Sequence, residues 1–262
     1  MNSVNKTLYI PLFGKAMVSN KGIILSDKKA EEIVKNQDLK LNKKSKSKWL
    51  GYFLSMRAKV FDNWVEKELK NKSDAIILHL GCGLDSRVLR VENFQNLWCD
   101  VDLKEVISER KRYYNETENY RMIDGDLKDG EFINLLPNSK QAIIVLEGVS
   151  MYLTNCELQR TLKKLAEKFE NLSVLVDCYT PFAVKMSKIK NPIKEVGVSK
   201  VYGIENPQLL EENTGLKFIK EHSLTPDYLI DELKGVEKFI FKHLYAGKTS
   251  KKLYKLYEYC SK

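Results

Sequence analysis

Residues 75–85 read AIILHLGCGLD, a short apolar run that ends in two glycines separated by one residue. An apolar run of this length, bounded by a turn signal, is typical of a strand buried on both faces of a sheet. Glycines at a strand-to-helix turn let the backbone approach a ligand closely, and the helix that follows presents free N–H groups. A tight turn without a ligand also explains Gly81 and Gly83, so this motif alone leaves both interpretations open.

Four further apolar runs follow and alternate with helical patterns. They predict strands at residues 97–102 (LWCDVD), 121–126 (RMIDGD), 142–148 (AIIVLEG) and 173–179 (SVLVDCY). Helices are predicted at 103–114 and 155–170, and Thr154 or Asn155 is the expected N-cap of the second. Strands that alternate with helices predict an α/β fold with a mostly parallel sheet and helices on both faces.

The flanking segments predict how the domain is completed. Residues 49–69 form an amphipathic helix, and residues 181–205, broken by Pro192 and Gly197, could cap the site. A sixth strand is expected at 217–224 and mostly helix at 228–245. Residues 253–260 (LYKLYEYC) favour a final strand, although a helix fits nearly as well. We therefore expect one domain over 1–262: a helical extension (1–72), a cofactor-binding core (73–180), the possible cap (181–205) and a segment that completes the sheet (206–262).

The composition argues against several classes of protein. The net charge is +9, and the excess is concentrated in 40–48 (KLNKKSKSK) and 248–262. We interpret both as solvated basic segments, with an acidic partner as the alternative, and expect no nucleic acid. Five irregularly spaced cysteines, no signal-peptide pattern and no apolar run of bilayer length predict a cytoplasmic protein without a membrane anchor. Three histidines without ligand spacing predict no metal. Oligomeric state stays open.

Acidic residues end three successive predicted strands. Asp102 lies about 20 residues past the glycines, where a carboxylate can bind ribose hydroxyls, though it could also cap the next helix. Asp126 could accept a hydrogen bond from an adenine amino group, with Leu127 against the ring; an ordinary turn is the alternative. Glu147 closes the fourth strand. Ser86 replaces the third glycine of a dinucleotide fingerprint, which weakens a pyrophosphate site.

Arg57 lies on the apolar stripe of the predicted helix at 49–69. A buried guanidinium needs an anionic partner, which is either a protein carboxylate or the carboxylate of a ligand. Arg87, at the start of the helix after the glycines, is expected in a surface ion pair, with contact to an acidic substrate as the alternative. His79 is expected in the core, and Asp177 is a candidate for an acceptor site.

These residues lie in a chain that resembles the leucine carboxyl methyltransferase family, especially its bacterial, tetracenomycin-type polyketide O-methyltransferases. The resemblance runs from about residue 28 to the C-terminus. It is carried by SMRAKVFD (55–62), LGCGLDSR (80–87), WCDVDLKEVISERKR (98–112), RMIDGDLKD (121–129) and LEGVSMYL (146–153). Cys82 and Ser86 stand where the family usually has alanine and threonine, and both are small.

The resemblance implies a seven-stranded class I, Rossmann-like methyltransferase fold. It also implies an S-adenosylmethionine site, whose residues would be Arg57, Gly81, Gly83, Asp102, Asp126, Leu127 and Glu147.

The expected reaction is O-methylation, preferably of a carboxylate on a polyketide-like or other small acid. A carboxylate is ionised near neutral pH and needs no base, which fits a sequence without an evident catalytic triad. A phenol acceptor is the alternative. Tyr152 and Tyr179 could orient the acceptor, or could simply be half-buried aromatic residues. The rival functions are a nicotinamide-dependent oxidoreductase, an RNA-modifying or RNA-binding protein, and a cofactor-binding protein without an acceptor pocket.

Overall fold

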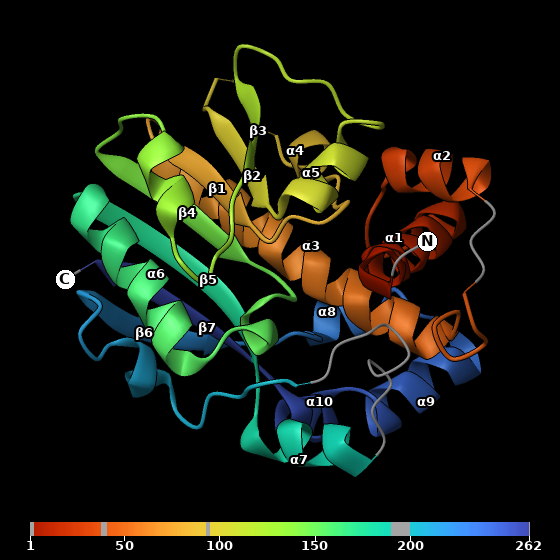
Figure 1. Ribbon diagram of the computed structural model, residues 1–262. Coiled ribbons are helices and arrows are strands. Elements are labelled where there is room, and N and C mark those ends of the chain that lie inside the picture. The colour runs from red at the N-terminus through yellow and green to blue at the C-terminus, as the bar shows by residue number, and fades with distance from the viewer. Residues whose placement is uncertain (1–2, 38–40, 93–94, 190–199, 262) are drawn as a thin grey trace.

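The computed structural model describes residues 3–37, 41–92, 95–189 and 200–261 (Figure 1). Seven strands form one sheet in the order β3-β2-β1-β4-β5-β7-β6. The strands are β1 (Ile76–Leu80), β2 (Trp98–Asp102), β3 (Tyr120–Asp124), β4 (Gln141–Leu146), β5 (Asn171–Tyr179), β6 (Leu216–His222) and β7 (Tyr254–Ser261). The first five pair in parallel, and β7 runs antiparallel to both β5 and β6. The α/β fold class is therefore confirmed, and 253–260 is mainly strand.

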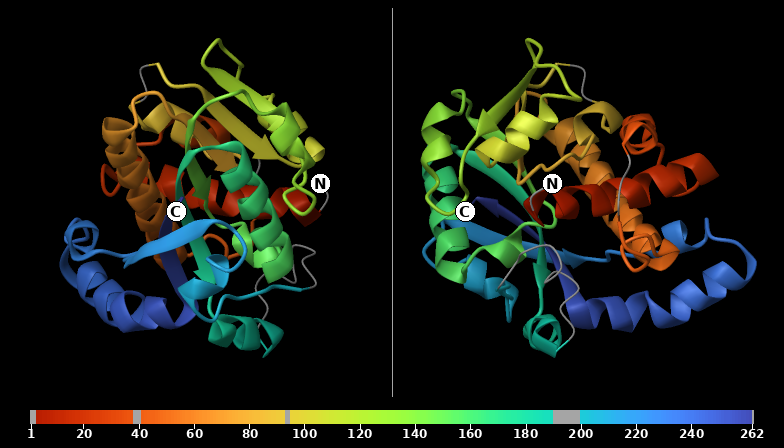
Figure 2. Two further views of the ribbon diagram at one scale, coloured as in Figure 1. Left: turned by 90° about the vertical axis from the view of Figure 1, so that its left-hand side faces the viewer. Right: turned by 45° about the vertical axis from the view of Figure 1, so that its right-hand side comes forward.

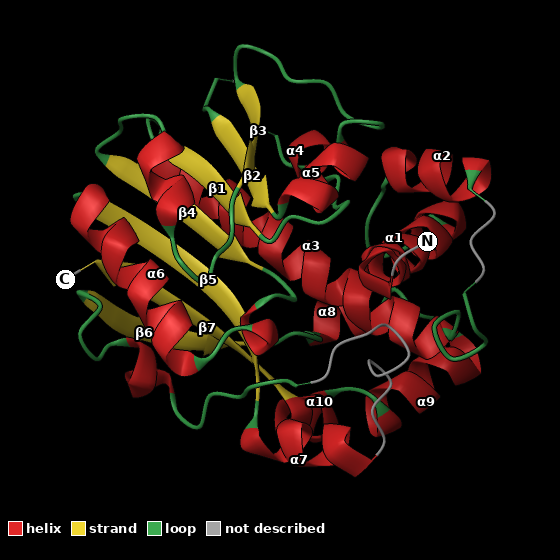
Figure 3. Cartoon of the chain, in the orientation of Figure 1, coloured by secondary structure: helices red, strands yellow, loops and turns green. Residues whose placement is uncertain are grey.

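Helices precede, connect and follow the strands (Figure 3). The α-helices are α1 (Ser3–Lys21), α2 (Lys28–Asn36), α3 (Lys48–Asn71), α4 (Arg87–Arg90), α5 (Lys104–Arg110), α6 (Asn155–Lys168), α7 (Pro181–Ile189), α8 (Asp227–Ile230), α9 (Gly235–Leu244) and α10 (Gly247–Leu253). Short 3₁₀ turns are η1 (Glu131–Leu135), η2 (Ser150–Tyr152) and η4 (Pro207–Leu210). Of the two expected N-caps, Thr154 is the one present, and it caps α6 through a capping box with Glu157.

Two apolar layers hold the sheet, because successive side chains of a strand point to opposite faces. Ile77, Ile143 and Leu175 face one layer, which includes residues of α1, α2 and α3. Leu78 and Ile144 face the other layer, which includes residues of α6. Both views of Figure 2 show α3 and α6 on opposite sides of the sheet. Because these layers cover the two faces of the sheet, a ligand site is expected at the carboxyl ends of the parallel strands.

The helix α1 crosses α3 at close range. A Cβ on Gly14 would lie 2.9 Å from the Cα of Gly51, so a side chain there would force the two helices apart. The predicted helix at 49–69 is α3, and the predicted extension 1–72 contains α1, α2 and α3. The predicted cap at 181–205 begins with α7. Residues 190–199 of this segment lie outside the described residues. No helix in the described part of the chain has the length and apolarity to cross a bilayer.

Candidate functional site

A cavity of about 700 Å³ opens at the carboxyl ends of β1 to β5. Its volume is in the range of pockets that bind cofactors and small ligands. Nine of the residues that the sequence singled out for cofactor or acceptor line it. They are Arg57, Gly81, Gly83, Asp102, Asp126, Leu127, Glu147, Tyr152 and Tyr179. The structure thus brings together one set of side chains from α3, β2, η2, β5 and the connecting turns.

The glycine turn after β1 forms one edge of the cavity. Gly81 has φ of 68°, and a Cβ there would lie 2.6 Å from Cγ2 of Val149, so both conformation and space require glycine. The Gly83 N–H donates to Oδ2 of Asp102 at 2.8 Å, and Nη1 of Arg110 donates to the Gly83 carbonyl oxygen at 3.0 Å. The turn is therefore fixed by neighbouring polar groups.

Asp102 accepts two backbone hydrogen bonds, from Gly83 and, at 2.8 Å, from Leu103. Burial raises the pKa of its carboxyl group to about 6, although both hydrogen bonds act in the opposite direction. Each oxygen keeps further acceptor capacity. In the unfolded chain the group loses its proton near pH 3.8. Between these pH values the folded state holds the extra proton, so raising the pH lowers the free energy of unfolding.

Apolar surface lies beside this carboxylate. Leu103 is 41% exposed and lines the cavity, and Leu127 lies buried in its wall. Asp126 accepts from the Lys128 N–H at 2.9 Å, so the turn that the sequence allowed is present, and its side chain also lines the cavity. Carboxylate oxygens next to two leucines fit a ribose joined to a planar base. Leu103 was missed in the sequence because it follows the strand as an ordinary apolar residue.

Arg57 is buried and pairs with two carboxylates. Its Nε donates to Glu147 at 3.0 Å and its Nη1 to Asp177 at 2.8 Å, so the protein-carboxylate alternative is present in the structure. Asp177 also accepts from the Gly148 N–H at 2.6 Å. Burial raises the pKa of Asp177 in spite of Arg57. Asp177 does not line the cavity, so its expected place at an acceptor site is wrong, and it positions Arg57 instead.

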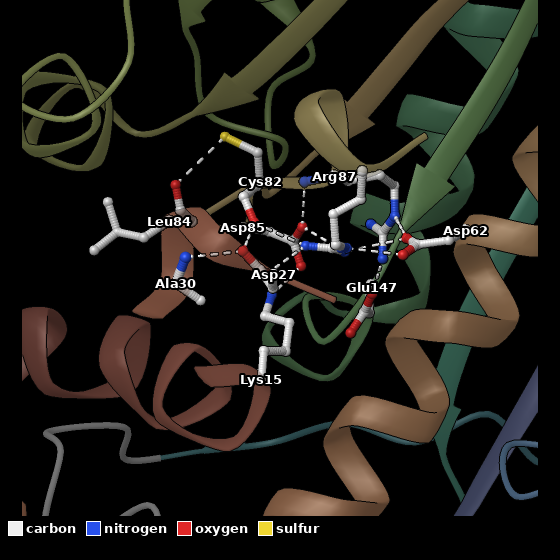
Figure 4. A network of polar contacts seen from close by, with 12 residues as sticks. Lys15, Asp27, Ala30, Asp62, Cys82, Leu84, Asp85, Arg87 and Glu147 are labelled. Atoms are coloured by element: carbon white, nitrogen blue, oxygen red, sulfur yellow. Dashed lines mark hydrogen bonds and ion pairs between the residues drawn. The ribbon is translucent and has the colours of Figure 1, made fainter. Parts of the chain in front are cut away.

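Arg87 is fully buried, which corrects the predicted surface ion pair. Its Nε donates to Asp62 at 2.7 Å and its Nη2 binds Glu147 (Figure 4). Burial alone would raise the pKa of Glu147, but Arg57 and Arg87 outweigh it and hold this pKa below its usual value. The sequence missed this arrangement because Asp62 lies 25 residues before Arg87, on α3.

The ion pairs continue into the N-terminal helices. Arg90 pairs with Asp62 and with Asp27, both at 2.8 Å, and with Asp85 at 3.0 Å. Lys15 of α1 is buried, binds Asp85 and lines the cavity (Figure 4). A network of buried charges therefore joins α1 to the strand ends. No sequence signal identified Lys15, since a lysine in a helix is usually solvated.

Tyrosine hydroxyls line the cavity near Arg57. The Tyr254 hydroxyl donates to that of Tyr179 at 3.1 Å, and the two rings pack edge to face. Burial raises the pKa of Tyr152 to about 12 and also raises the pKa values of Tyr179 and Tyr254. These hydroxyls stay protonated at neutral pH, so they can donate hydrogen bonds but cannot remove a proton.

Proteins of similar structure carry the same fold. A putative methyltransferase from Thermobifida fusca superposes with a TM-score of 0.60 at 14% identity, over 90% of this chain and 87% of that one. A magnesium protoporphyrin IX methyltransferase from Synechocystis PCC 6803 gives 0.53 at 11% identity, over 90% and 94%. At such identities the likeness shows the fold alone.

Comparison of the sequence with known proteins identifies the family. The tetracenomycin polyketide synthesis O-methyltransferase TcmP of Streptomyces glaucescens is 28% identical over 92% of this chain and 90% of its own length. The S-adenosyl-L-methionine-dependent methyltransferase dpfgK of Gibberella zeae is 26% identical over 87% and 85%. The leucine carboxyl methyltransferase family matches residues 4–166, which is more than half of the chain. The protein therefore belongs to the leucine carboxyl methyltransferase family.

Proposed function

We propose that this protein is an S-adenosylmethionine-dependent O-methyltransferase that esterifies a carboxylate of a small acid. Family membership and the named relatives support methyl transfer from this cofactor. The cavity at the strand ends supports the place where it binds. The tyrosine-lined part of that cavity supports the choice of a carboxylate over a phenol.

The cavity residues fit the cofactor group by group. Asp102 would accept hydrogen bonds from the ribose hydroxyls, and Leu103 and Leu127 would enclose the base. Arg57 would bind the carboxylate of the methionine part, and Glu147 would face its ammonium group. The buried network around them contains five carboxylates (Asp27, Asp62, Asp85, Glu147, Asp177) and four cations (Lys15, Arg57, Arg87, Arg90). The surplus negative charge complements a ligand that carries a sulfonium.

S-adenosylmethionine, when bound, supplies a methyl group that the acceptor oxygen takes as the carbon–sulfur electron pair returns to sulfur. The chain has to bring the two atoms within roughly 3–3.5 Å and exclude water. Tyr152 and Tyr179 orient the acceptor through their hydroxyl groups. Lys15, in the α1 helix that lines the cavity, helps to close it from solvent.

One observation carries the choice of acceptor. Among the described residues that line the cavity beside Arg57, the tyrosines have raised pKa values and Glu147 is occupied by two guanidinium groups. His79 also lines the cavity, but its Nε2 accepts from Nη1 of Arg87 at 3.1 Å and burial lowers its pKa, so its free lone pair is already used and it is a weak base. A phenol, with a pKa of about 10, would need a base that these side chains do not offer. A carboxylate is already ionised and needs none.

A screen of matched aromatic acids and phenols with labelled cofactor tests this proposal. We expect label in the acids, in products that mild alkali hydrolyses, as methyl esters should. We also expect the rate with saturating acid to stay nearly constant from pH 7 to 9, because the acceptor is fully ionised throughout. Alkali-stable ethers formed from phenols alone, at a rate that rises with pH, would show that the carboxylate assignment is incorrect.

Asp102→Ala is expected to weaken cofactor binding by about 1–3 kcal/mol, from the loss of charged hydrogen bonds to the ribose. Because the pKa of Asp102 is about 6, wild-type affinity should rise as the pH increases from 5 to 7 and then level off. Calorimetric titration of the cofactor at several pH values measures both effects.

Asp124→Asn is the matched control for this prediction. Asp124 aligns with Asp102 on the neighbouring strand β3, but it is exposed and does not line the cavity. Its variant should keep wild-type affinity and the same pH dependence, whereas Asp102→Asn should lose the step near pH 6. An unchanged step in Asp102→Asn would mean that another group binds the ribose.

A further inference from the structure

A second cavity, of about 570 Å³, is lined by residues from the first turns of α3 and from the segment formed by α9 and α10. Figure 1 shows where these helices lie in the chain. Its walls are aromatic. Trp49 stacks on Tyr245 with ring centroids 5.3 Å apart, and Phe53 packs on Tyr254 at 5.3 Å. Leu244 and Tyr245 are 60% and 38% exposed. Large apolar side chains left exposed around a hollow are typical of a binding site.

This second cavity adjoins the first one. Lys44, Leu50 and Tyr254 line both. Tyr254 starts β7 and hydrogen-bonds Tyr179 at the end of β5, whereas Asp102 ends β2. Since β2 lies three strands from β5 in the sheet, the second cavity opens at the side of the first that is remote from the proposed ribose site. A methyl acceptor that enters from that side would not have to pass the proposed ribose site.

Two lysines complete the entrance. Lys43 and Lys44 line the second cavity and are exposed, and in the described part of the chain neither forms an ion pair with a carboxylate. A further lysine, Lys200, lines the first cavity. Positive charge at the mouth of an apolar cavity attracts an anion with an apolar body and raises its association rate.

We infer that the second cavity holds the aromatic body of the methyl acceptor, while the carboxylate of the acceptor passes Tyr254 into the first cavity. The inference rests on the proposed function and adds the substrate class, a planar aromatic acid, and the residues that select it. Trp49 and Tyr245 stack on each other, so they and Phe53 would contact the acceptor rings through their edges and apolar surface. Lys44, which lines both cavities, would guide the carboxylate.

The test uses 2-naphthoate as the acid and 2-naphthalenemethanol as its neutral counterpart. Thr249→Trp would fill the cavity from the exposed residue Thr249, so the fold should be retained. We expect this variant to bind 2-naphthoate at least about tenfold more weakly by calorimetry, as steric exclusion from an apolar pocket predicts. Lys248→Trp, one residue earlier, exposed and outside both cavities, should bind it like the wild type, and cofactor affinity should be unchanged in both.

Lys44→Ala tests the charge separately. It should weaken binding of 2-naphthoate several-fold, mainly through the association rate, and leave binding of 2-naphthalenemethanol unchanged. Trp49 fluorescence should respond to both compounds, because Trp49 lies in the cavity wall while Trp64 and Trp98 are buried elsewhere.

Four outcomes would overturn the inference. The first is that Thr249→Trp binds 2-naphthoate as tightly as the wild type, and the second is that Lys248→Trp weakens this binding equally. The third is that the wild type shows no saturable binding of millimolar 2-naphthoate. The fourth is a concentration-dependent dimer that Thr249→Trp abolishes while 2-naphthoate binding is unchanged. The last result would assign the cavity to contact between two copies. If 2-naphthoate binds as expected but no acid is methylated, the proposed reaction fails and the pocket stands. If acids are methylated equally by Thr249→Trp, the reaction stands and the pocket fails.

Discussion

Arg57→Ala is expected to lower the free energy of unfolding by about 3–5 kcal/mol at neutral pH, the usual cost of leaving a buried charge unpaired. The side chain is 5% exposed, and it is the cation that pairs with Asp177, whose side chain is 0% exposed. Without Arg57, Asp177 keeps the Gly148 N–H as its partner. Urea unfolding of variant and wild type at pH 7 measures the difference. Cofactor binding should also weaken, by about 1–3 kcal/mol.

The pH dependence of this deficit identifies its cause. Burial already raises the pKa of Asp177, and loss of the guanidinium should raise it further. Below that pKa the carboxyl group is neutral and its burial costs little, so the deficit should shrink as the pH falls and grow as it rises. Arg57→Lys keeps the positive charge but loses the planar guanidinium that binds two carboxylates at once, so its stability should be intermediate. A deficit that is independent of pH would point to lost packing instead of an unpaired carboxylate.

Arg87→Met is the second substitution with a large expected effect, again about 3–5 kcal/mol of unfolding free energy. Arg87 is 0% exposed and joins Asp62 of α3 to Glu147 at the end of β4, so its loss leaves two buried carboxylates with fewer cations. Methionine preserves much of the volume, which limits the contribution from a cavity. Thermal and urea unfolding at pH 7 test the value.

Arg160→Met provides the comparison for Arg87→Met. Arg160 is exposed on α6, and surface substitutions of this kind usually change stability by less than about 0.5 kcal/mol. Similar small losses in both variants would mean that the interior tolerates Asp62 and Glu147 without Arg87. A much larger loss of unfolding free energy in Arg87→Met than in Arg160→Met would show that Arg87 acts as a buried cation and not in the surface ion pair that the sequence predicts.

The sheet could be predicted from sequence because its signals are local. The apolar runs that became β1, β2, β4 and β5 are nearly continuous, as strands buried on both faces require. Acidic residues at the carboxyl ends of parallel strands meet at one edge of a sheet, so the sequence alone predicts that Asp102 and Glu147 lie on the same side. β7 was ambiguous because its alternation is imperfect, and pairing with both β5 and β6 decided it.

The charge network could not be predicted, because each of its pairs joins distant residues. Lys15 and Asp85 are 70 positions apart, and Arg57 and Asp177 are 120 apart. A helical pattern shows which face is apolar but not which carboxylate a buried guanidinium will meet. The α1 helix gave little signal of its own, since it contains Pro11 and Gly14, both unfavourable within a helix. Its contacts with α3 outweigh that propensity.

The place of β7 between β5 and β6 has a consequence for biosynthesis. Of all the strands in the sheet, β7 is the last to leave the ribosome, yet it occupies an interior position. Until it emerges, β6 lacks the strand that joins it to the rest of the sheet, and β5 presents an open edge capable of pairing with another nascent chain. We expect cotranslational folding to yield a five-stranded intermediate that depends on chaperones until residues 254–261 are released.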